Sequence, residues 1–230
     1  MTTVQVISLG GSIISPGEID VDFLRDFYNT IKEYLDTHSE QKLIIVCGGG
    51  SPARRYQQAY SRIVAATDKP AMDWIGIAAT KLNAELVRFL FHEFCTDNVV
   101  SDPTLPTEIT GRIMVASGWK PGFSTDYDAV LLAERFKAQS VINLSNIEQV
   151  YTADPKKDPQ ARPIKDITWD RFKEIVGDTW EPGKNVPFDP VATAHAARIG
   201  LEVVFAAGKD SANLKNILYA HPFTGTLIHP

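Results

Sequence analysis

Short apolar runs alternate with longer amphipathic stretches along the whole chain. The runs are rich in β-branched residues and predict buried strands, whereas the stretches between them place apolar residues at helical spacing. Strands that alternate with helices are typical of a mostly parallel sheet with helices on both faces. We therefore predict an α/β protein, a three-layer αβα sandwich with a mostly parallel central sheet. The predicted strands are residues 4–9, 43–47, 113–116, 140–144, 202–206 and 225–229.

The predicted helices begin at residues that suit helix starts. Asp20 is expected to cap one helix, Asp126 another, and Asp189 a third that has Pro190 at its first position. Further helices are predicted over 53–64, 71–94, 168–176 and 211–219. Helical spacing predicts that the Asp20 helix buries Phe23, Phe27, Ile31 and Leu35, and that the long helix buries Ile75, Leu82, Leu86, Phe89 and Leu90.

Composition and charge narrow the class of protein. With 44% apolar and 22% charged residues, the chain of 230 residues has the composition of a soluble globular protein. A net charge of −5 gives no general attraction to nucleic acid or to an anionic membrane. No apolar run approaches the length of a membrane span, and no secretory signal is visible. Two isolated thiols, Cys47 and Cys95, fit a reducing cytoplasm, and Cys47 is interpreted as a small buried residue.

The spacing of the histidines and of other potentially catalytic residues argues against a metal site and against a hydrolase-type catalytic site. The five histidines show no metal-ligand spacing, so no resident metal site is predicted. No Ser/His/Asp or paired-carboxylate arrangement is indicated. A polar, proline-punctuated stretch over 146–164 hints at two lobes within one domain that spans residues 1–230, divided at about residue 140. A single sheet that serves two ligands would give the same pattern.

Two predicted strands run directly into glycines. Residues 4–9 lead into Gly-Gly-Ser at 10–12, and residues 43–47 lead into three glycines at 48–50. Turns without side chains let backbone N–H groups approach an anion closely, and a helix that follows adds partial positive charge. A tight strand-to-helix turn is the competing explanation, and we favour phosphate binding. Arg54 or Arg55, one turn into the following helix, could reach back to a phosphate; neither turn has the Walker or the Gly-x-Gly-x-x-Gly pattern.

A third glycine-rich loop follows the strand at 113–116. Trp119 suits stacking on a ring and Lys120 suits a phosphate, while Ser124 and Thr125 offer hydroxyl donors. An ordinary capped turn with Trp119 in the core explains the same residues. Further along, the strand-exit loop with Ser145, Asn146, Tyr151 and Asp154 could hold a nucleotide base, against the alternative of a surface loop with a packed tyrosine.

Taken together, these motifs resemble the amino-acid-kinase superfamily, and within it the archaeal-type uridylate (UMP) kinases. The strongest stretch is Val-Tyr-Thr-Ala-Asp-Pro-Lys-Lys-Asp-Pro at 150–159, where a Tyr-x-x-Asp-Pro run follows a strand-exit asparagine. The resemblance covers nearly the whole chain. The other similar stretches are residues 8–12, 48–54, 73–76, 80–84, 121–126, 189–192 and 225–226.

The resemblance implies the amino-acid-kinase fold and phosphoryl transfer from ATP, with Mg²⁺, to UMP. It implies an acceptor-binding lobe over about 1–139, an ATP-binding lobe over about 140–230, and a cytoplasmic homo-oligomer, a dimer or a hexamer. The ATP-binding residues carried over are Gly10, Gly11, Ser12, Gly50, Arg54, Ser145, Asn146, Tyr151 and Asp154. The acceptor-binding residues carried over are Gly49, Asp73, Trp119, Lys120, Pro121, Gly122, Phe123, Ser124 and Thr125.

The chain departs from the superfamily pattern beside the predicted pocket. Ser8 stands where many members carry a lysine, Trp119 where a threonine is usual, and Glu148-Gln149 where Asp-Gly is usual. Residues 183–188 replace a serine-rich loop and bring in Lys184. We therefore expect Arg54, Lys120 or Lys184 to balance the charge of the transferred group, with Mg²⁺. The alternatives are a kinase of the same fold for another small phosphate or carboxylate, and a non-catalytic nucleotide- or anion-binding protein.

Overall fold

A computed structural model describes residues 3–153, 158–176 and 187–230. Its main sheet has seven strands in the order β3-β2-β1-β4-β8-β9-β7, and the first five of these run parallel. β9 runs antiparallel to β8 and parallel to β7, so the prediction of a mostly parallel sheet is confirmed. The strands are β1 (Thr3–Leu9), β2 (Gln41–Cys47), β3 (Ile113–Ala116), β4 (Ser140–Ser145), β7 (Asp166–Thr168), β8 (Glu202–Ala207) and β9 (Thr226–His229).

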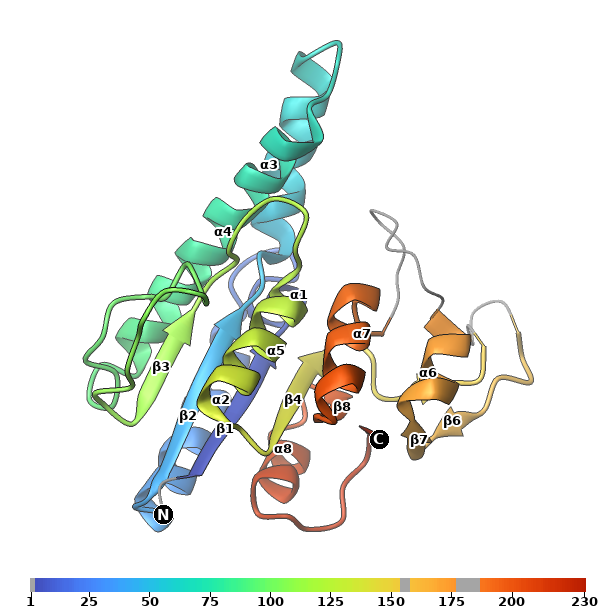
Figure 1. Cartoon of the computed structure of the whole chain (residues 1–230). Helices are drawn as coiled ribbons and strands as arrows, with labels where there is room; N and C mark the ends of the chain where they lie inside the picture. The colour runs from blue at the N-terminus through green and yellow to red at the C-terminus, as the bar shows by residue number, and fades with distance from the viewer. Residues whose placement is uncertain (1–2, 154–157, 177–186) are drawn as a thin grey trace.

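Helices cover both faces of the sheet, as Figure 1 shows. Asp20 caps α2 by accepting from Phe23 N at 3.0 Å, and Asp189 caps α7 by accepting from Ala192 N at 2.8 Å. Both caps are therefore as predicted, whereas the strand β7 and the small hairpin of β5 (Val150–Tyr151) and β6 (Pro163–Ile164) were not foreseen. The helices are α1 (Gly11–Ile14), α2 (Val21–Thr37), α3 (Gly50–Ile63), α4 (Lys69–Leu90), α5 (Thr125–Phe136), α6 (Trp169–Val176), α7 (Pro190–Ile199) and α8 (Ser211–Leu218).

The strands bury alternate side chains in two separate cores. In β1, Ile7 and Leu9 pack toward α2 and α4, while Val6 packs toward α5 and α7. This alternation follows from the pleat of a strand, whose successive side chains point to opposite faces. Ser8 has the same parity as Val6 and therefore lies on the α5 face, where it is 3% exposed. Cys47 is fully buried in the core under α2, as predicted.

The long helix α4 buries only part of the face that helical spacing predicted: Leu86 and Leu90 pack against the core and Ile75 is half-buried. Leu82 is 67% exposed and Phe89 is 62% exposed, so their predicted burial is wrong. Thr80 and Asn83 are buried instead, together with Ala84 and Val87. The helix ends at Leu90 rather than at 94. Figure 1 shows that α4 and α3 form a hairpin that extends beyond the sheet.

One sheet runs through both halves of the chain. β1 pairs with β4 from Val6↔Val141 to Leu9↔Leu144, across the division predicted at about residue 140. The carboxyl ends of β1, β2, β3 and β4 consequently lie side by side at one edge of the sheet. Among the residues that the structure describes, no helix is long and apolar enough to cross a membrane.

Candidate active site

The two glycine turns that follow β1 and β2 touch each other. Leu9 and Cys47 are register partners at the ends of these parallel strands, so the residues after them meet. A Cβ atom on Gly11 would lie 2.1 Å from Gly50 N, and one on Gly48 would lie 2.4 Å from Gly11 N. Glycine is required at both positions because the two backbones occupy the space of a side chain. Gly50 also has a φ of 65°, a conformation that glycine adopts without strain.

A buried asparagine of α4 holds the second turn. Asn83, 1% exposed, donates its side-chain amide to Gly48 O at 2.7 Å and to Gly49 O at 3.3 Å. On the other side of the junction, Gly10 N donates to Leu144 O at 2.9 Å, which ties the first turn to β4. The site residues predicted from the sequence did not include Asn83. Asn83 lies in the stretch 80–84 that resembles the superfamily, but no role was assigned to it, and helical spacing did not place it on the buried side of α4.

Helix α3 begins directly at the glycine junction. Its N-cap is Gly49, and no side chain caps it. Ser12, from the first turn, is half-buried at the same junction. Arg54 and Arg55 lie one turn along α3, and both side chains are exposed. Neither forms an ion pair with a residue in the described parts of the chain, so their roles stay predictions.

The tryptophan loop, residues 117–124, is attached to two helices through its backbone N–H groups. Gly118 N donates to Thr80 Oγ1 of α4 at 2.8 Å, and Trp119 N donates to Asp128 Oδ2 of α5 at 3.1 Å. At its tip, Gly122 N donates to Asp73 Oδ2 of α4 at 2.9 Å. The structure thus brings Asp73, a predicted acceptor-binding residue, next to the loop that was predicted to bind the same acceptor.

Pro121 and Gly122 explain the shape of the loop tip. Phe123 N donates to Lys120 O at 3.3 Å, and Gly122 has a φ of 87°. Proline at the second position and a glycine with positive φ at the third are the features of a type II turn. Ser124 then caps α5 by accepting from Tyr127 N at 3.3 Å, which corrects the prediction that Asp126 is the cap.

Lys120 lies over aromatic rings. Its Nζ is 3.7 Å from the centroid of the Trp119 ring and 5.1 Å from that of Phe123, and these two rings lie 5.3 Å apart. A cation on a ring face is stabilised by the ring quadrupole. Lys120 therefore covers one face of Trp119, which was predicted to stack on a ring of the ligand. Thr125, the remaining loop-end residue of that prediction, is the first residue of α5 and is half-buried.

Asp126 lies inside the first turn of α5 and joins three elements. Its Oδ1 accepts from Ser8 Oγ of β1 at 3.0 Å and from Asn143 Nδ2 of β4 at 2.8 Å. Burial raises the pKa of Asp126 to about 6, and the negative charge of Asp189 adds to this, although the bonds from Ser8 and Asn143 lower it.

Asp128, two residues further, is fully buried, and burial raises its pKa to about 7. The sequence indicated no paired-carboxylate arrangement; in the structure the negative charges of Asp126 and Asp189 add to the rise in the pKa of Asp128. Strongly perturbed carboxyl groups beside a glycine-lined junction are typical of functional sites.

The predicted nucleoside-binding residues lie at the end of β4 and beyond it. Ser145 Oγ accepts from Ile147 N at 3.0 Å, Asn146 is exposed, and Tyr151 is half-buried in the hairpin of β5 and β6. The structure places Ser145 beside Gly10, since Gly10 bonds to the preceding residue, Leu144. Asp154 and Lys184 lie outside the described residues.

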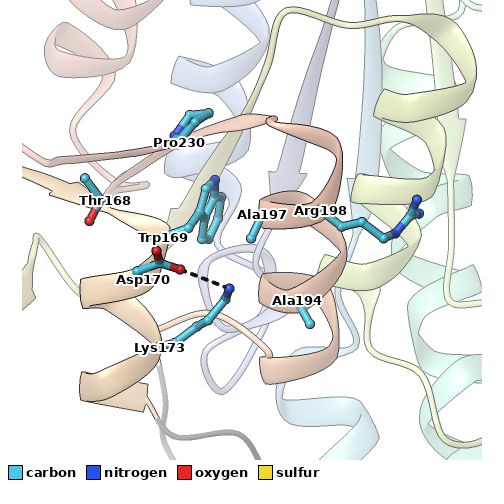
Figure 2. Close-up of a pocket in the computed structure, with 8 residues that line it drawn as sticks. All are labelled: Thr168, Trp169, Asp170, Lys173, Ala194, Ala197, Arg198 and Pro230. Atoms are coloured by element: carbon cyan, nitrogen blue, oxygen red, sulfur yellow. Dashed lines mark hydrogen bonds and ion pairs between the residues drawn. The ribbon is translucent and has the colours of Figure 1, made fainter.

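A cavity of about 310 Å³ lies elsewhere, between α6, α7 and Pro230 (Figure 2). None of the predicted site residues lines it. Lys173 Nζ in its wall lies 3.5 Å from Asp170 Oδ1, so these two charges largely offset each other. The glycine junction and the tryptophan loop, rather than this cavity, form the candidate active site.

Comparison with known families agrees with this geometry. Residues 3–206 match the model of the amino acid kinase family. The chain belongs to this family. The parallel sheet with a glycine junction at its carboxyl edge is thus the fold of an amino acid kinase, and the expectation from the sequence motifs is confirmed.

Within the amino acid kinase family, the chain is similar to uridylate kinases of known sequence and structure. The chain is 34% identical to the uridylate kinase of Methanospirillum hungatei, over 97% of this chain and 93% of that protein. It matches the crystal structure of the uridylate kinase from Archaeoglobus fulgidus with a TM-score of 0.82 and 31% identity, covering 97% of this chain and 99% of that one. The UMP kinase structure from Bacillus anthracis shares the fold, with a TM-score of 0.75 at 18% identity, and covers 99% of this chain and 96% of that one.

Proposed function

We propose that this protein is a uridylate kinase that transfers a phosphoryl group from ATP to UMP. The observation that carries the proposal is the similarity to the uridylate kinase of Methanospirillum hungatei, 34% identical over 97% of this chain. The contact between the glycine turns supports it, because two backbone turns at one sheet edge can hold two phosphate-bearing ligands next to each other. In the reaction a phosphate oxygen of UMP attacks the γ-phosphorus of ATP, the bond to the β–γ bridging oxygen breaks, and UDP and ADP leave.

We propose for the residues the roles that the resemblance to uridylate kinases implies. We assign the phosphates of ATP to Gly10, Gly11, Ser12, Gly50 and Arg54, and its nucleoside to Ser145, Asn146, Tyr151 and Asp154. We assign UMP to Gly49, Asp73 and the tryptophan loop with Thr125. This gives an acceptor-binding lobe before about residue 140 and an ATP-binding lobe after it. Lys120 and Lys184 remain candidates, beside Arg54, for balancing the charge of the transferred group.

Magnesium fits this site as part of the nucleotide. No group of three histidine, cysteine, aspartate or glutamate side chains that could hold a metal occurs in the described parts of the chain. We therefore propose that Mg²⁺ is held chiefly by the phosphates of ATP, where it neutralises charge when bound. Asp126, close to the end of β1, accepts hydrogen bonds from Ser8 and Asn143, which are both neutral donors.

A panel of acceptors tests the proposal. ADP release, coupled to a reporter enzyme, is measured with ATP, Mg²⁺ and each of UMP, CMP, AMP, GMP and small carboxylic acids. Turnover with UMP is expected. Turnover with another acceptor only would show a kinase of altered specificity, for which Trp119 is the structural reason. Tight ATP binding without any turnover would show a non-catalytic nucleotide-binding protein.

The outer face of the α3–α4 hairpin supports a homo-oligomer. Large apolar side chains are exposed there, with relative exposures of 55% for Trp74, 67% for Leu82, 62% for Phe89 and 83% for Ile63. Large apolar side chains exposed in number on one pair of helices commonly mark a protein interface. Light scattering of the native protein and of Leu82→Glu tests this, since the charge is expected to lower the mass of the assembly.

We also propose a cytoplasmic location, which rests on the two free cysteines.

A further inference from the structure

Asp128 is a buried carboxyl group that uses only one of its two oxygens. It lies in the first turn of α5 and is 0% exposed. Oδ2 accepts the backbone N–H of Trp119 at 3.1 Å, whereas Oδ1 has no hydrogen-bond partner among the described residues. A buried carboxyl oxygen without a partner costs free energy, so a position that keeps one calls for a compensating role.

The surroundings of Asp128 make its charge costly. Burial raises the pKa of Asp128 to about 7, and the negative charges of Asp126 on the same helix, Asp102 in the loop after α4 and Asp189 at the start of α7 add to the rise. The hydrogen bond from Trp119 acts in the opposite direction. The positive charge of Lys120 lowers the pKa of Asp102. For Asp128, the bond from Trp119 is the interaction with the described residues that favours the ionised form.

The hydrogen bond from Trp119 N to Asp128 fixes the part of the tryptophan loop that carries the indole ring. The neighbouring N–H of Gly118 is bound to Thr80, and the tip of the loop is bound to Asp73 through Gly122. Between these two attachments, Asp128 holds the Trp119 backbone. The indole ring of Trp119 contacts both Lys120 and Phe123. Loss of the Asp128 bond would free the part of the loop on which the aromatic contacts depend.

We propose that Asp128 is a positioning residue for the acceptor: it holds Trp119 from inside α5 and so sets the affinity for the acceptor without touching it. This inference rests on the proposed function, in which the tryptophan loop binds UMP. A bond to an ionised carboxylate is stronger than one to a neutral carboxylic acid. The loop is therefore held more firmly when Asp128 is ionised than when it carries a proton.

Two substitutions separate the hydrogen bond from the charge. Asp128→Val removes the acceptor oxygen and is expected to raise KM for UMP about 10-fold, with kcat and KM for ATP changed less than about threefold. Asp128→Asn keeps an acceptor for Trp119 N and is expected to restore KM for UMP to within about threefold of the wild type. Unchanged KM for UMP in Asp128→Val, or equal losses for UMP and ATP, would overturn the positioning role.

A control and a spectroscopic readout exclude a merely structural effect. Asn213→Ala removes a buried amide in α8 that bonds Thr224 N and O, so it is expected to lower Tm while KM for UMP stays unchanged. In the wild type, the NMR signal of the Trp119 amide is expected to shift with the titration of Asp128, and this shift disappears in Asp128→Asn. The same shift in both proteins would overturn the contact.

The two proposals fail in distinguishable ways. A wild-type protein that does not phosphorylate UMP refutes the proposed function and, with it, the role of Asp128 toward that acceptor, even if the Trp119 amide follows Asp128. A wild type that phosphorylates UMP, beside an Asp128→Val variant with the same KM for UMP, refutes only the role of Asp128.

Discussion

Ser8 Oγ donates a hydrogen bond to Asp126 Oδ1 over 3.0 Å and thereby joins the end of β1 to the first turn of α5. The superfamily pattern places a lysine at this position of the first strand. A serine on the α5 face can bond the carboxylate but cannot neutralise it, and Asn143, the second donor to the same oxygen, is also neutral. The charge that balances the transferred phosphoryl group must therefore come from other residues or from Mg²⁺.

Arg54 is the first candidate for that charge. We expect Arg54→Ala to lower kcat/KM for UMP phosphorylation by about 100-fold, because a cation that contacts the transferred group stabilises the transition state more than the ground state. Arg55, the exposed neighbour on α3, is the matched control, and Arg55→Ala is expected to keep kcat/KM within about twofold. Equal losses in both variants would assign the effect to general surface charge.

The contact between the glycine turns predicts intolerance to one methyl group. Gly11→Ala places a Cβ 2.1 Å from Gly50 N, and neither backbone can move without breaking the strand pairing behind it. We expect a loss of about 3 kcal/mol or more in the free energy of unfolding, measured with urea. Gly17→Ala is the control, since its Cβ meets nothing within 4 Å, and it is expected to unfold like the wild type.

Asn83 holds the second turn from α4. Asn83→Ala leaves the Gly48 carbonyl, bonded at 2.7 Å in the native protein, without its side-chain donor in a buried position. We expect the free energy of unfolding to fall by about 1–3 kcal/mol and KM to rise for both substrates. Lys81→Ala, at an exposed position of the same helix, is expected to change neither quantity. A loss of stability in Asn83→Ala with both KM values unchanged would contradict the link between this turn and binding.

The pKa of Asp128 predicts a pH-dependent stability. The folded protein holds a proton on this group up to about pH 7, whereas an unfolded aspartate loses it near pH 4. The folded state therefore binds more protons in this window, and its stability falls as the pH rises through it. Asp128→Asn does not ionise, so its stability relative to the wild type is expected to increase from about pH 4 to about pH 7 and then level off.

Urea unfolding of both proteins at about pH 5 and about pH 8 measures this difference. Asp170→Asn serves as a control, because the Asp170 side chain is 96% exposed, and its difference from the wild type is expected to be small at both pH values. A relative stability of Asp128→Asn that is greatest at the acidic pH would show that the folded protein holds Asp128 ionised.

The position of the glycine junction could be predicted from the sequence. Strands that end in glycines must bring those glycines to one edge of a parallel sheet, and Gly11 and Gly48 meet there. The direct contact between the two glycine turns could not be predicted from the sequence in the same way. Close approach of two backbones and close approach of a backbone to a phosphate both require glycine, and the sequence does not distinguish them.

The buried face of α4 was predicted only in part, for a physical reason: Leu86 and Leu90 pack against the core, but Leu82 and Phe89 do not. Apolar spacing assigns Leu82 and Phe89 to the core. A helix that holds neighbouring loops by hydrogen bonds, however, needs polar side chains on its inner face. Thr80 and Asn83 are such side chains, and they bond Gly118 N and Gly48 O. Asp128 was missed for a related reason, because a carboxylate early in a helix is usually read as a favourable partner of the helix dipole. Its burial is visible only in the structure, where its carboxylate accepts the backbone N–H of Trp119.

The place of β9 in the sheet has a consequence for synthesis of the protein. Residues 226–229 form an interior strand, β9, which lies between β8 and β7, although β7 precedes both β8 and β9 in the chain. On the ribosome, β7 emerges early but has no partner to pair with until β9 has left the exit tunnel. β7 remains open to wrong partners for the time needed to translate about 60 residues, at about 5–20 residues per second, and the edge of β8 for about the last 20 of them.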